Sequence, residues 1–421
     1  MKHSSSAFRE VPYMGVIYVV AEAAKRGFTN GDPQWCNLGQ GQPEVGALEG
    51  APARVGLMPV EPIDHAYGPV GGIPAMRAAV AEHYNRLYRA GRRSKYTPDN
   101  VAIAAGGRLA ISRLLAALGS VRVGYQTPDY TAYEDMLTYH AHRLTPVHVP
   151  TTADEQFKVS PRRFASLVPE RRLGAYLFSN PCNPTGALLE GQELERYVHT
   201  ARSTGCTLLV DEFYSHYIFD SRGAPGARPV SVAHHVEHVD EDPAIIIDGL
   251  TKNFRYPGWR VGWILGPKAT IEQVVRAASA IDGGPPTSVQ RAAIEVLSPS
   301  RADQETSAVR HVFARKRSLL HEGLSRLGVR FPHATRGTFY LWGDISALPE
   351  PFCDADRFFE LALERRVMIV PGRFFDVNPG AHRPANPEYA RWVRFSFGPV
   401  EDNVRLGLSR LCELVAGARS T

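Results

Sequence analysis

The stretch IIIDGLTKNFRYPGWRVGW, residues 245–263, decides the fold prediction. It begins with an almost wholly apolar run, which is typical of a strand inside a parallel sheet that is covered on both faces. Polar residues follow at once, where α/β sheets place their ligands. Lys252 comes first, with Arg255 and Arg260 close behind. An apolar wall and nearby cations disfavour a protonated amine, so Lys252 is a candidate imine-forming lysine, with a solvent-reaching surface lysine as the alternative.

The rest of the chain alternates between helical and strand patterns. The runs AYLFSN (175–180) and TLLVDE (207–212) resemble the first run, and residues 76–90 have the apolar spacing of a helix. Past about residue 300, a long helix at 303–327 leads to shorter strands and a terminal helix. We therefore predict an α/β fold in which a mostly parallel central sheet is flanked by helices, together with a smaller α+β domain.

Composition excludes several classes of protein. The chain has 421 residues, 22% of them charged, and a net charge of +5 that no run of like charges concentrates. This argues against binding to nucleic acid or to a membrane surface. Five scattered cysteines without a CxxC motif favour reduced thiols in a cytoplasmic protein. We expect no signal peptide and no membrane span, because no long apolar run occurs.

Two motifs suggest other chemistry and are disfavoured. LGQGQPEVG (38–46) contains GxG but not GxGxxG, and its proline opposes a following helix, so a Rossmann site is not expected. HHVEH (234–238) matches a zinc-protease pattern with only three fixed positions, in a chain that has 15 histidines. We expect a surface helix there and no metal site.

Other polar residues follow the apolar runs. Asp211 ends one of them, and a carboxylate there needs a cation or hydrogen bonds, unless it caps a helix. Tyr214 follows three residues later. In SNPCNPTG (179–186) two prolines restrict the loop, which presents Asn183 at the sheet edge. A protonated heteroaromatic nitrogen would be a suitable partner for Asp211.

Two more segments favour a flat, phosphorylated ligand. AAGGRLAIS (104–112) joins a strand to a helix, and N–H groups at the helix start, at Gly107 and Arg108, would bind phosphate. PDYTAY supplies Tyr130 and Tyr133, either of which could cover a flat ring or simply pack. Together these features indicate the protein groups expected around pyridoxal phosphate.

The motifs YGPVGG, the glycine-led helix, PxYxxY, NPCNPTG, DEFY, TKNFRYPGWRVGW and RFSFG occur in that order. In order and spacing they resemble fold-type I pyridoxal-phosphate enzymes of the aminotransferase class I/II family, over nearly the whole chain. The resemblance implies a large cofactor-binding domain at 56–300 and a C-terminal small domain at 301–421. The N-terminal segment, 1–55, would belong to the small domain.

The resemblance also implies roles for the catalytic residues. Lys252 would hold pyridoxal 5′-phosphate as an internal aldimine, and Asp211 would keep its pyridine nitrogen protonated. Asn183 and Tyr214 would bond the ring oxygen, and Tyr130 would stack on the ring. The residues that would hold the phosphate are Gly107, Arg108, Arg260 and, from a second subunit, Tyr67.

The substrate and the oligomer are implied in the same way. Arg394 would clamp the substrate α-carboxylate, helped by the backbone at Gly41. Because Tyr67 of one subunit would reach the phosphate bound by the other, the resemblance implies a homodimer with shared active sites. Thr287 would also approach the cofactor of the other subunit.

Three departures or open points remain. Gly249 stands where the family usually has serine, so phosphate binding would be weaker or would come from Thr251. Arg373, in PGRFFD, could read a distal acidic group of the substrate or face solvent. Residues 13–18 are expected to begin an ordinary first helix, with a segment folded over the substrate as the alternative.

The leading functional prediction is transamination. An amino acid would displace Lys252, which would then move a proton from Cα to C4′ of the cofactor. The alternative is lyase, γ-replacement or cyclase chemistry on the same scaffold, as in enzymes similar to 1-aminocyclopropane-1-carboxylate synthase, C–S lyases or capreomycidine synthase. A third class, a regulator that has an aminotransferase fold, would need an added DNA-binding module.

Overall fold

The computed structural model describes residue 7, residues 11–226 and residues 228–419. Its largest element is a sheet whose strands lie in the order β2-β8-β7-β6-β5-β3-β4. All neighbouring pairs are parallel except the two that involve β8, which runs against β2 and β7. The mostly parallel α/β sheet predicted from the sequence is therefore confirmed. The strands are β2 (Val101–Ala104), β3 (Arg122–Thr127), β4 (Thr145–Pro150), β5 (Ala175–Ser179), β6 (Thr207–Asp211), β7 (Ala244–Gly249) and β8 (Gly262–Leu265).

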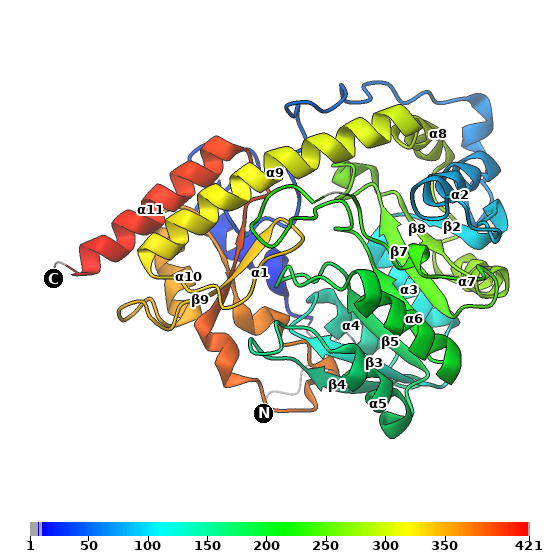
Figure 1. The fold of residues 1–421 in the computed structure, drawn as a ribbon. Coiled ribbons are helices and arrows are strands. Elements are labelled where there is room, and N and C mark those ends of the chain that lie inside the picture. Colours follow the sequence, from blue (N-terminus) through cyan, green and yellow to red (C-terminus); the bar gives the residue numbers. More distant parts are fainter. Residues whose placement is uncertain (1–6, 8–10, 227, 420–421) are drawn as a thin grey trace.

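Helices cover this sheet and extend beyond it (Figure 1). They are α1 (Gly15–Ala24), α2 (Pro74–Tyr88), α3 (Gly107–Ala117), α4 (Ala132–Tyr139), α5 (Pro161–Arg171), α6 (Gly191–Thr204), α7 (Lys268–Ile281), α8 (Thr287–Val296), α9 (Pro299–Leu327), α10 (Ala355–Glu364) and α11 (Glu401–Arg419). The helices predicted at 76–90 and 303–327 correspond to α2 and α9. At the end of α6, Gly205 adopts the left-handed conformation that turns the chain into β6.

The apolar runs of the sequence reflect burial on both faces of the sheet. Along β7, Ile245 and Ile247 join one core cluster with residues of α3 and α7. Ile246 points the other way and joins a second cluster with residues of α2, α5 and α6. Each buried isoleucine contributes roughly 1.5–3 kcal/mol, so a strand with two apolar faces is held from both sides.

A second group of strands lies beside the large sheet. Strands β11 (Val370–Pro371), β12 (Trp392–Ser396) and β9 (Tyr340–Asp344) form an antiparallel sheet in that order. Near the start of the chain, β1 (Cys36–Asn37) pairs in parallel with β10 (Val367–Met368). The N-terminal segment therefore contacts the C-terminal region, while the domain boundaries at 55 and 300 remain predictions. Helices α9 and α11 pack together on this part of the molecule (Figure 1).

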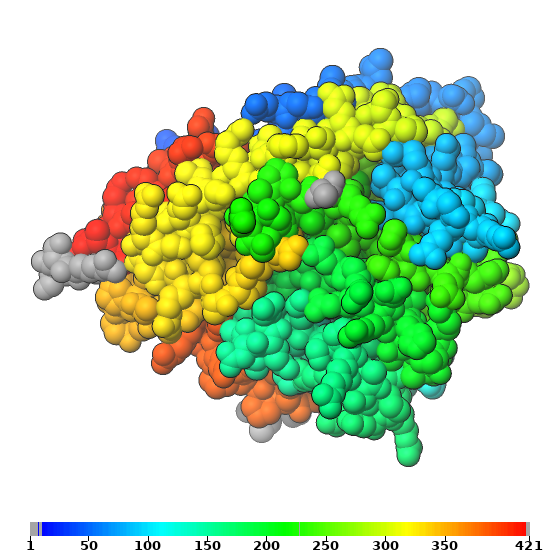
Figure 2. All heavy atoms as spheres, viewed as in Figure 1, coloured from blue at the N-terminus to red at the C-terminus, as the bar shows by residue number. Residues whose placement is uncertain are grey.

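The N-terminal segment then crosses to the large sheet. Residues 44–60, shown by blue spheres in Figure 2, run along the yellow helix α9. Arg301 donates to the Ala53 carbonyl at 2.8 Å, and Gln304 donates to the Gly50 carbonyl at 3.1 Å. These contacts guide the segment toward Tyr67.

Two local predictions need comment. Helix α1 begins at Gly15, so residues 13–18 contain the start of a helix, as expected. The HHVEH segment was expected to be a surface helix, and this was wrong: it contains only the end of a short 3-10 turn, Val232–His234. In the described part of the chain, no group of three or more histidine, cysteine or acidic residues could hold a metal ion. No described helix is long and apolar enough to span a membrane.

Candidate active site

A cavity of about 740 Å³ lies at the carboxyl ends of β5, β6 and β7, and residues of β9 and β12 also line it. Ser179 pairs with Asp211 across β5 and β6, so these two strand ends lie next to one another. With the exception of Tyr67 and Thr287, which were expected to reach the cofactor of a second subunit, the residues predicted for the site all line this cavity. They are Gly41, Gly107, Arg108, Tyr130, Asn183, Asp211, Tyr214, Lys252, Arg260 and Arg394.

Lys252 follows β7 and points its amine into the cavity. Its Nζ donates to the carbonyl of Gly41. Burial and then the charges of Arg394, Arg260 and Arg108 lower the pKa of Lys252 from 10.5 to about 7, against the opposing effect of Asp211. The amine is therefore neutral, and nucleophilic, in a large fraction of molecules near neutral pH.

Asp211 is the last residue of β6 and is buried. Its Oδ2 accepts a hydrogen bond from the Tyr133 hydroxyl at 2.9 Å, and its Oδ1 accepts one from the Phe213 N–H at 3.2 Å. Burial raises the pKa of Asp211 to about 6, although both hydrogen bonds and Lys252 lower it. The carboxylate is thus held in place by donors but lacks a full countercharge.

Arg394, on β12, reaches across to the loop that follows β5. Its Nη1 donates to Asn183 Oδ1 at 2.9 Å, and its Nη2 donates to the Gly39 carbonyl at 3.0 Å. The guanidinium carbon lies 3.9 Å from the ring centre of Tyr340, whose hydroxyl is 2.9 Å from that of Tyr214. Arg394 Nε is buried and has no hydrogen-bond partner among the described residues.

The glycine-led start of α3 forms another corner of the cavity. Gly106 has a φ of 90°, and a side chain there would collide with the guanidinium of Arg260. The Nε of Arg108 donates to the Tyr130 hydroxyl at 3.1 Å. The hydroxyl oxygen of Thr251 is buried at this cavity and has no partner within the described chain. A helix start, two arginines and an unpaired hydroxyl therefore line the cavity, a set suited to an anion.

The model of one protein family, aminotransferase class I and II, matches residues 33–411. The chain belongs to this family. The match includes every residue that lines the cavity except three on α1 and two in the loop after it.

Individual members of the aminotransferase class I and II family are similar over most of the chain. An aspartate/prephenate aminotransferase from Thermus thermophilus is 28% identical over 84% of each chain. A valine–pyruvate aminotransferase from Mycobacterium tuberculosis is 28% identical over 95% of this chain and 96% of its own. A crystal structure of an aminotransferase from the same organism superposes with a TM-score of 0.77, 28% identity and 97% coverage of both chains.

These similarities confirm the predicted fold-type I architecture and the predicted enzyme class. The named relatives are aminotransferases, which favours amino-group transfer over the lyase or cyclase alternative.

Several residues singled out in the sequence do not line the cavity, among them Tyr67, Arg255 and Arg373. Tyr67 is fully exposed. Arg255, expected beside Lys252, is buried in an ion pair with Glu305 at 2.6 Å, so among the two arginines of that stretch only Arg260 faces Lys252. Arg373 pairs with Asp356 of α10 at 2.8 Å.

The sequence did not predict two hydroxyl contacts at this site, one made by Tyr133 and one made by Tyr340. Tyr133 was expected to cover a ring or to pack, but it donates to Asp211. Tyr340 was not considered at all, although its hydroxyl meets Tyr214 and its ring supports Arg394. The only signal for Tyr133 was its place in PDYTAY, three residues after Tyr130.

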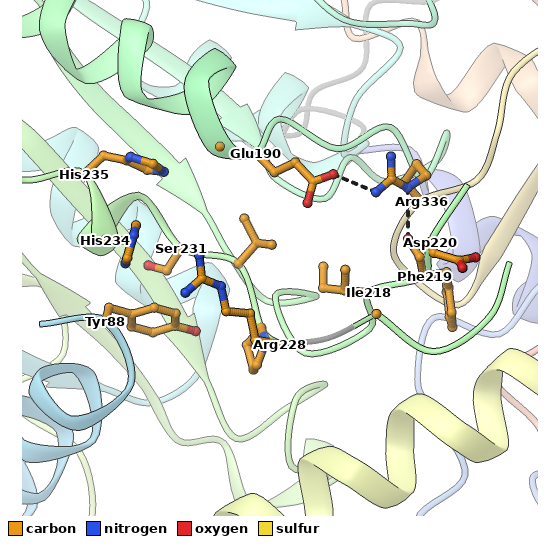
Figure 3. A pocket seen from close by; sticks show the side chains of 14 residues that line it. Tyr88, Glu190, Ile218, Phe219, Asp220, Arg228, Ser231, His234, His235 and Arg336 are labelled. Carbon is orange, nitrogen blue, oxygen red and sulfur yellow. Dashed lines mark hydrogen bonds and ion pairs between the residues drawn. The ribbon is translucent and has the colours of Figure 1, made fainter. Parts of the chain in front are cut away.

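A second, smaller cavity of about 420 Å³ lies away from these residues (Figure 3). Tyr88, His234 and His235 lie on one side of it, and the ion pair between Glu190 and Arg336, 2.6 Å long, lies on the other. Since none of the predicted site residues lines it, we assign the chemistry to the larger cavity.

Proposed function

We propose that the protein transfers the amino group of an α-amino acid to an α-keto acid, with pyridoxal 5′-phosphate bound in the larger cavity. One observation carries the proposal: the amine of Lys252, the buried carboxylate of Asp211 and the buried guanidinium of Arg394 face the same cavity. These three groups supply an imine-forming amine, a partner for a cationic ring and a clamp for a carboxylate.

The cavity fits this cofactor on grounds independent of the family. Burial raises the pKa of Asp211 to about 6, so a protonated ring nitrogen beside it would supply a missing countercharge. The unpaired hydroxyl of Thr251 would become a donor to the phosphate. A serine at residue 249 could not serve instead without a backbone shift, because a Cβ there would lie 2.5 Å from the Val261 carbonyl oxygen.

The remaining roles are those that the family resemblance implies, and the residues concerned all line the cavity. Asn183 and Tyr214 would bond the ring oxygen, and Tyr130 would cover the ring. The groups that would hold the phosphate are Gly107, Arg108, Thr251 and Arg260. When bound, the cofactor supplies an electron sink that makes the Cα proton of the substrate acidic.

The chain's own residues would then orient the substrate and move the proton. Arg394 would hold the α-carboxylate with two parallel N–H donors, which fixes Cα relative to Lys252. Lys252 Nζ would take the proton from Cα and return it at C4′. Burial and the neighbouring arginines, which lower the pKa of Lys252 to about 7 in the cofactor-free protein, favour the neutral amine that this first step needs. Such a positioned base typically contributes ~10²–10⁴-fold to the rate.

The central test is Lys252→Ala, with Lys268→Ala as a matched control because Lys268 is partly exposed on α7. We expect the first variant to lose at least ~10²-fold in kcat and all borohydride-trapped cofactor, and the control to keep both. Mass spectrometry of the peptide that contains residue 252 and an assay of keto-acid formation provide the measurements. Near-native turnover by Lys252→Ala would refute the assignment, and release of ammonia in place of stoichiometric amine transfer would favour a lyase.

A homodimer with shared sites is part of the proposal. The segment that leads to Tyr67 exposes large apolar side chains: Leu57 is 85% exposed, Val60 64%, Ile63 68% and Tyr67 104%. Several large apolar side chains exposed along one short segment are typical of an interface, and a second copy of the chain would cover them.

Mixed subunits test this sharing. Tyr67→Ala and Lys252→Ala proteins would each be impaired alone. A mixed dimer would contain one site with both native residues. Random pairing of equal amounts makes about half of the dimers mixed, so refolding the two variants together should restore up to about a quarter of the wild-type activity. No recovery from a verified mixed dimer would contradict a shared site.

We also propose a cytoplasmic location, which the free cysteines support.

A further inference from the structure

The proposed roles account for the charged side chains that line the larger cavity. Asp211 and Lys252 serve the cofactor, and Arg394 is already oriented by Asn183 and Gly39 for a carboxylate. Arg260 lies against the glycine turn at Gly106. Arg108, at the same helix start, is tied through its Nε to Tyr130. Both arginines therefore belong to the phosphate corner.

Among the residues that the structure describes, what remains of the lining is uncharged. Helix α1 contributes Val16, Ile17 and Val20, and Phe28 follows in the next loop. Ile111 adds an apolar side chain from α3. The other lining residues without a proposed role are also uncharged: Asn30, Asn37, Gln40, Gln42, Ser179, Phe213, Pro257, Gly258 and Tyr340.

The apolar wall lies close to the reacting amine. A Cβ placed on Gly41 would lie 3.6 Å from a methyl group of Val16. The carbonyl of the same Gly41 accepts the hydrogen bond from Lys252 Nζ. A substrate whose Cα is presented to Lys252 therefore has the α1 wall within reach of its side chain.

Two arginines that do not line the cavity, one of them the candidate reader Arg373, are already paired with acidic residues. Arg373 donates to both carboxylate oxygens of Asp356 at 2.8 and 3.0 Å. Its guanidinium carbon also lies 5.3 Å from the ring centre of Tyr18, on α1, so Arg373 braces this helix. Near the exposed Tyr67 segment, Arg291 forms an ion pair with Asp64.

We infer that the substrates are α-amino acids whose side chain is uncharged and largely apolar, and that this side chain packs against α1. The inference rests on the proposed function and narrows it. A charged carboxylate placed against the α1 wall would lose water without gaining a cation from the described residues of this chain, which disfavours aspartate and glutamate as donors.

A donor series tests the inference directly. Leucine, methionine and phenylalanine should give kcat/KM values ~10-fold or more above those of aspartate and glutamate. Binding without chemistry gives a second readout: 4-methylpentanoate should bind the holoenzyme more tightly than glutarate by a similar factor in calorimetry. Aspartate or glutamate turned over as well as leucine would overturn the inference. If the enzyme takes up cofactor normally but converts none of these donors in the half-reaction, the proposed function would be overturned, and the inference with it.

Substitutions on α1 locate the contact. Ile17 lines the cavity and is 44% exposed, so Ile17→Asp adds a charge to the wall without burying it in the core. Ala24→Asp adds the same charge to the exposed end of the same helix and is the matched control. We expect Ile17→Asp to lower kcat/KM for leucine ~10-fold with cofactor absorbance unchanged, and Ala24→Asp to change neither. Equal behaviour of the two variants would show that α1 does not contact the side chain.

Discussion

The lowered pKa of Lys252 gives the sharpest prediction, because it can be measured on the protein without cofactor. Only the neutral amine attacks an electrophile. Acetylation of Lys252 by dilute acetic anhydride, a neutral reagent, should therefore rise with pH, reach half its maximum near pH 7 and level off above it. The direction follows from burial and from three arginines, all of which disfavour the charged ammonium.

The magnitude is large enough to be decisive. At pH 7, a lysine with a pKa of 10.5 has about 0.03% of its amine neutral, whereas a pKa of about 7 leaves about half of it neutral. Lys252 should therefore present on the order of 10³-fold more neutral amine than an ordinary lysine, and it should be acetylated faster than a lysine of equal access. Competitive labelling against Nα-acetyllysine, with peptide mass spectrometry, measures both the rate and its midpoint.

Two variants separate the causes. Arg394 contributes the largest of the charge effects on Lys252, so Arg394→Gln should move the midpoint of labelling to higher pH. Arg373→Gln removes a cation that pairs with Asp356 outside the cavity and should leave the midpoint unchanged. A wild-type midpoint near pH 10, or a downward shift in Arg394→Gln, would refute the electrostatic reasoning.

Three further substitutions test separate contacts. Thr251→Val should weaken pyridoxal 5′-phosphate binding ~10-fold in a fluorescence titration without lowering the melting temperature of the cofactor-free protein, since the buried hydroxyl has no partner there to lose; a lower melting temperature would contradict this. Tyr133→Phe removes a donor that lowers the pKa of Asp211, so the pH below which cofactor affinity declines should move upward; an unchanged pH profile would argue against the contact. Arg255→Gln leaves the buried Glu305 without its main partner and should reduce the free energy of unfolding, measured in urea, by about 3 kcal/mol. A loss below about 1 kcal/mol would mean that Arg54, 3.5 Å from Glu305, is sufficient to pair its charge.

Much of the fold could be predicted because the relevant signals are local. The strands β5, β6 and β7 are apolar on both faces, so each gives a continuous run in the sequence, and each is followed by polar residues at one edge of the sheet. Those strand ends predicted Asn183, Asp211 and Lys252 as neighbours, and the structure brings them to one cavity. The reversed direction of β8 was beyond reach, since its apolar run is the same whichever way the strand points.

The contacts that could not be predicted join distant parts of the chain. Tyr133 and Asp211 are 78 residues apart, and Tyr214 and Tyr340 are 126 residues apart. No periodicity encodes which way a helix such as α4 turns a hydroxyl, because that depends on packing against the sheet. Arg255 illustrates the converse: its proximity to Lys252 in sequence suggested a shared site, but Glu305, on α9, holds it elsewhere.

Arg394 belongs to β12 of the small sheet, but one of the two acceptors of its guanidinium, Asn183 Oδ1, belongs to a loop of the large sheet. A carboxylate that binds to the unpaired Nε would give Arg394 a further contact and so strengthen the link between the two sheets. Simple monocarboxylates, which have no amine to react, should therefore make the contact between the small sheet and the large sheet less mobile. Slower amide hydrogen exchange along β12 in their presence would measure this effect.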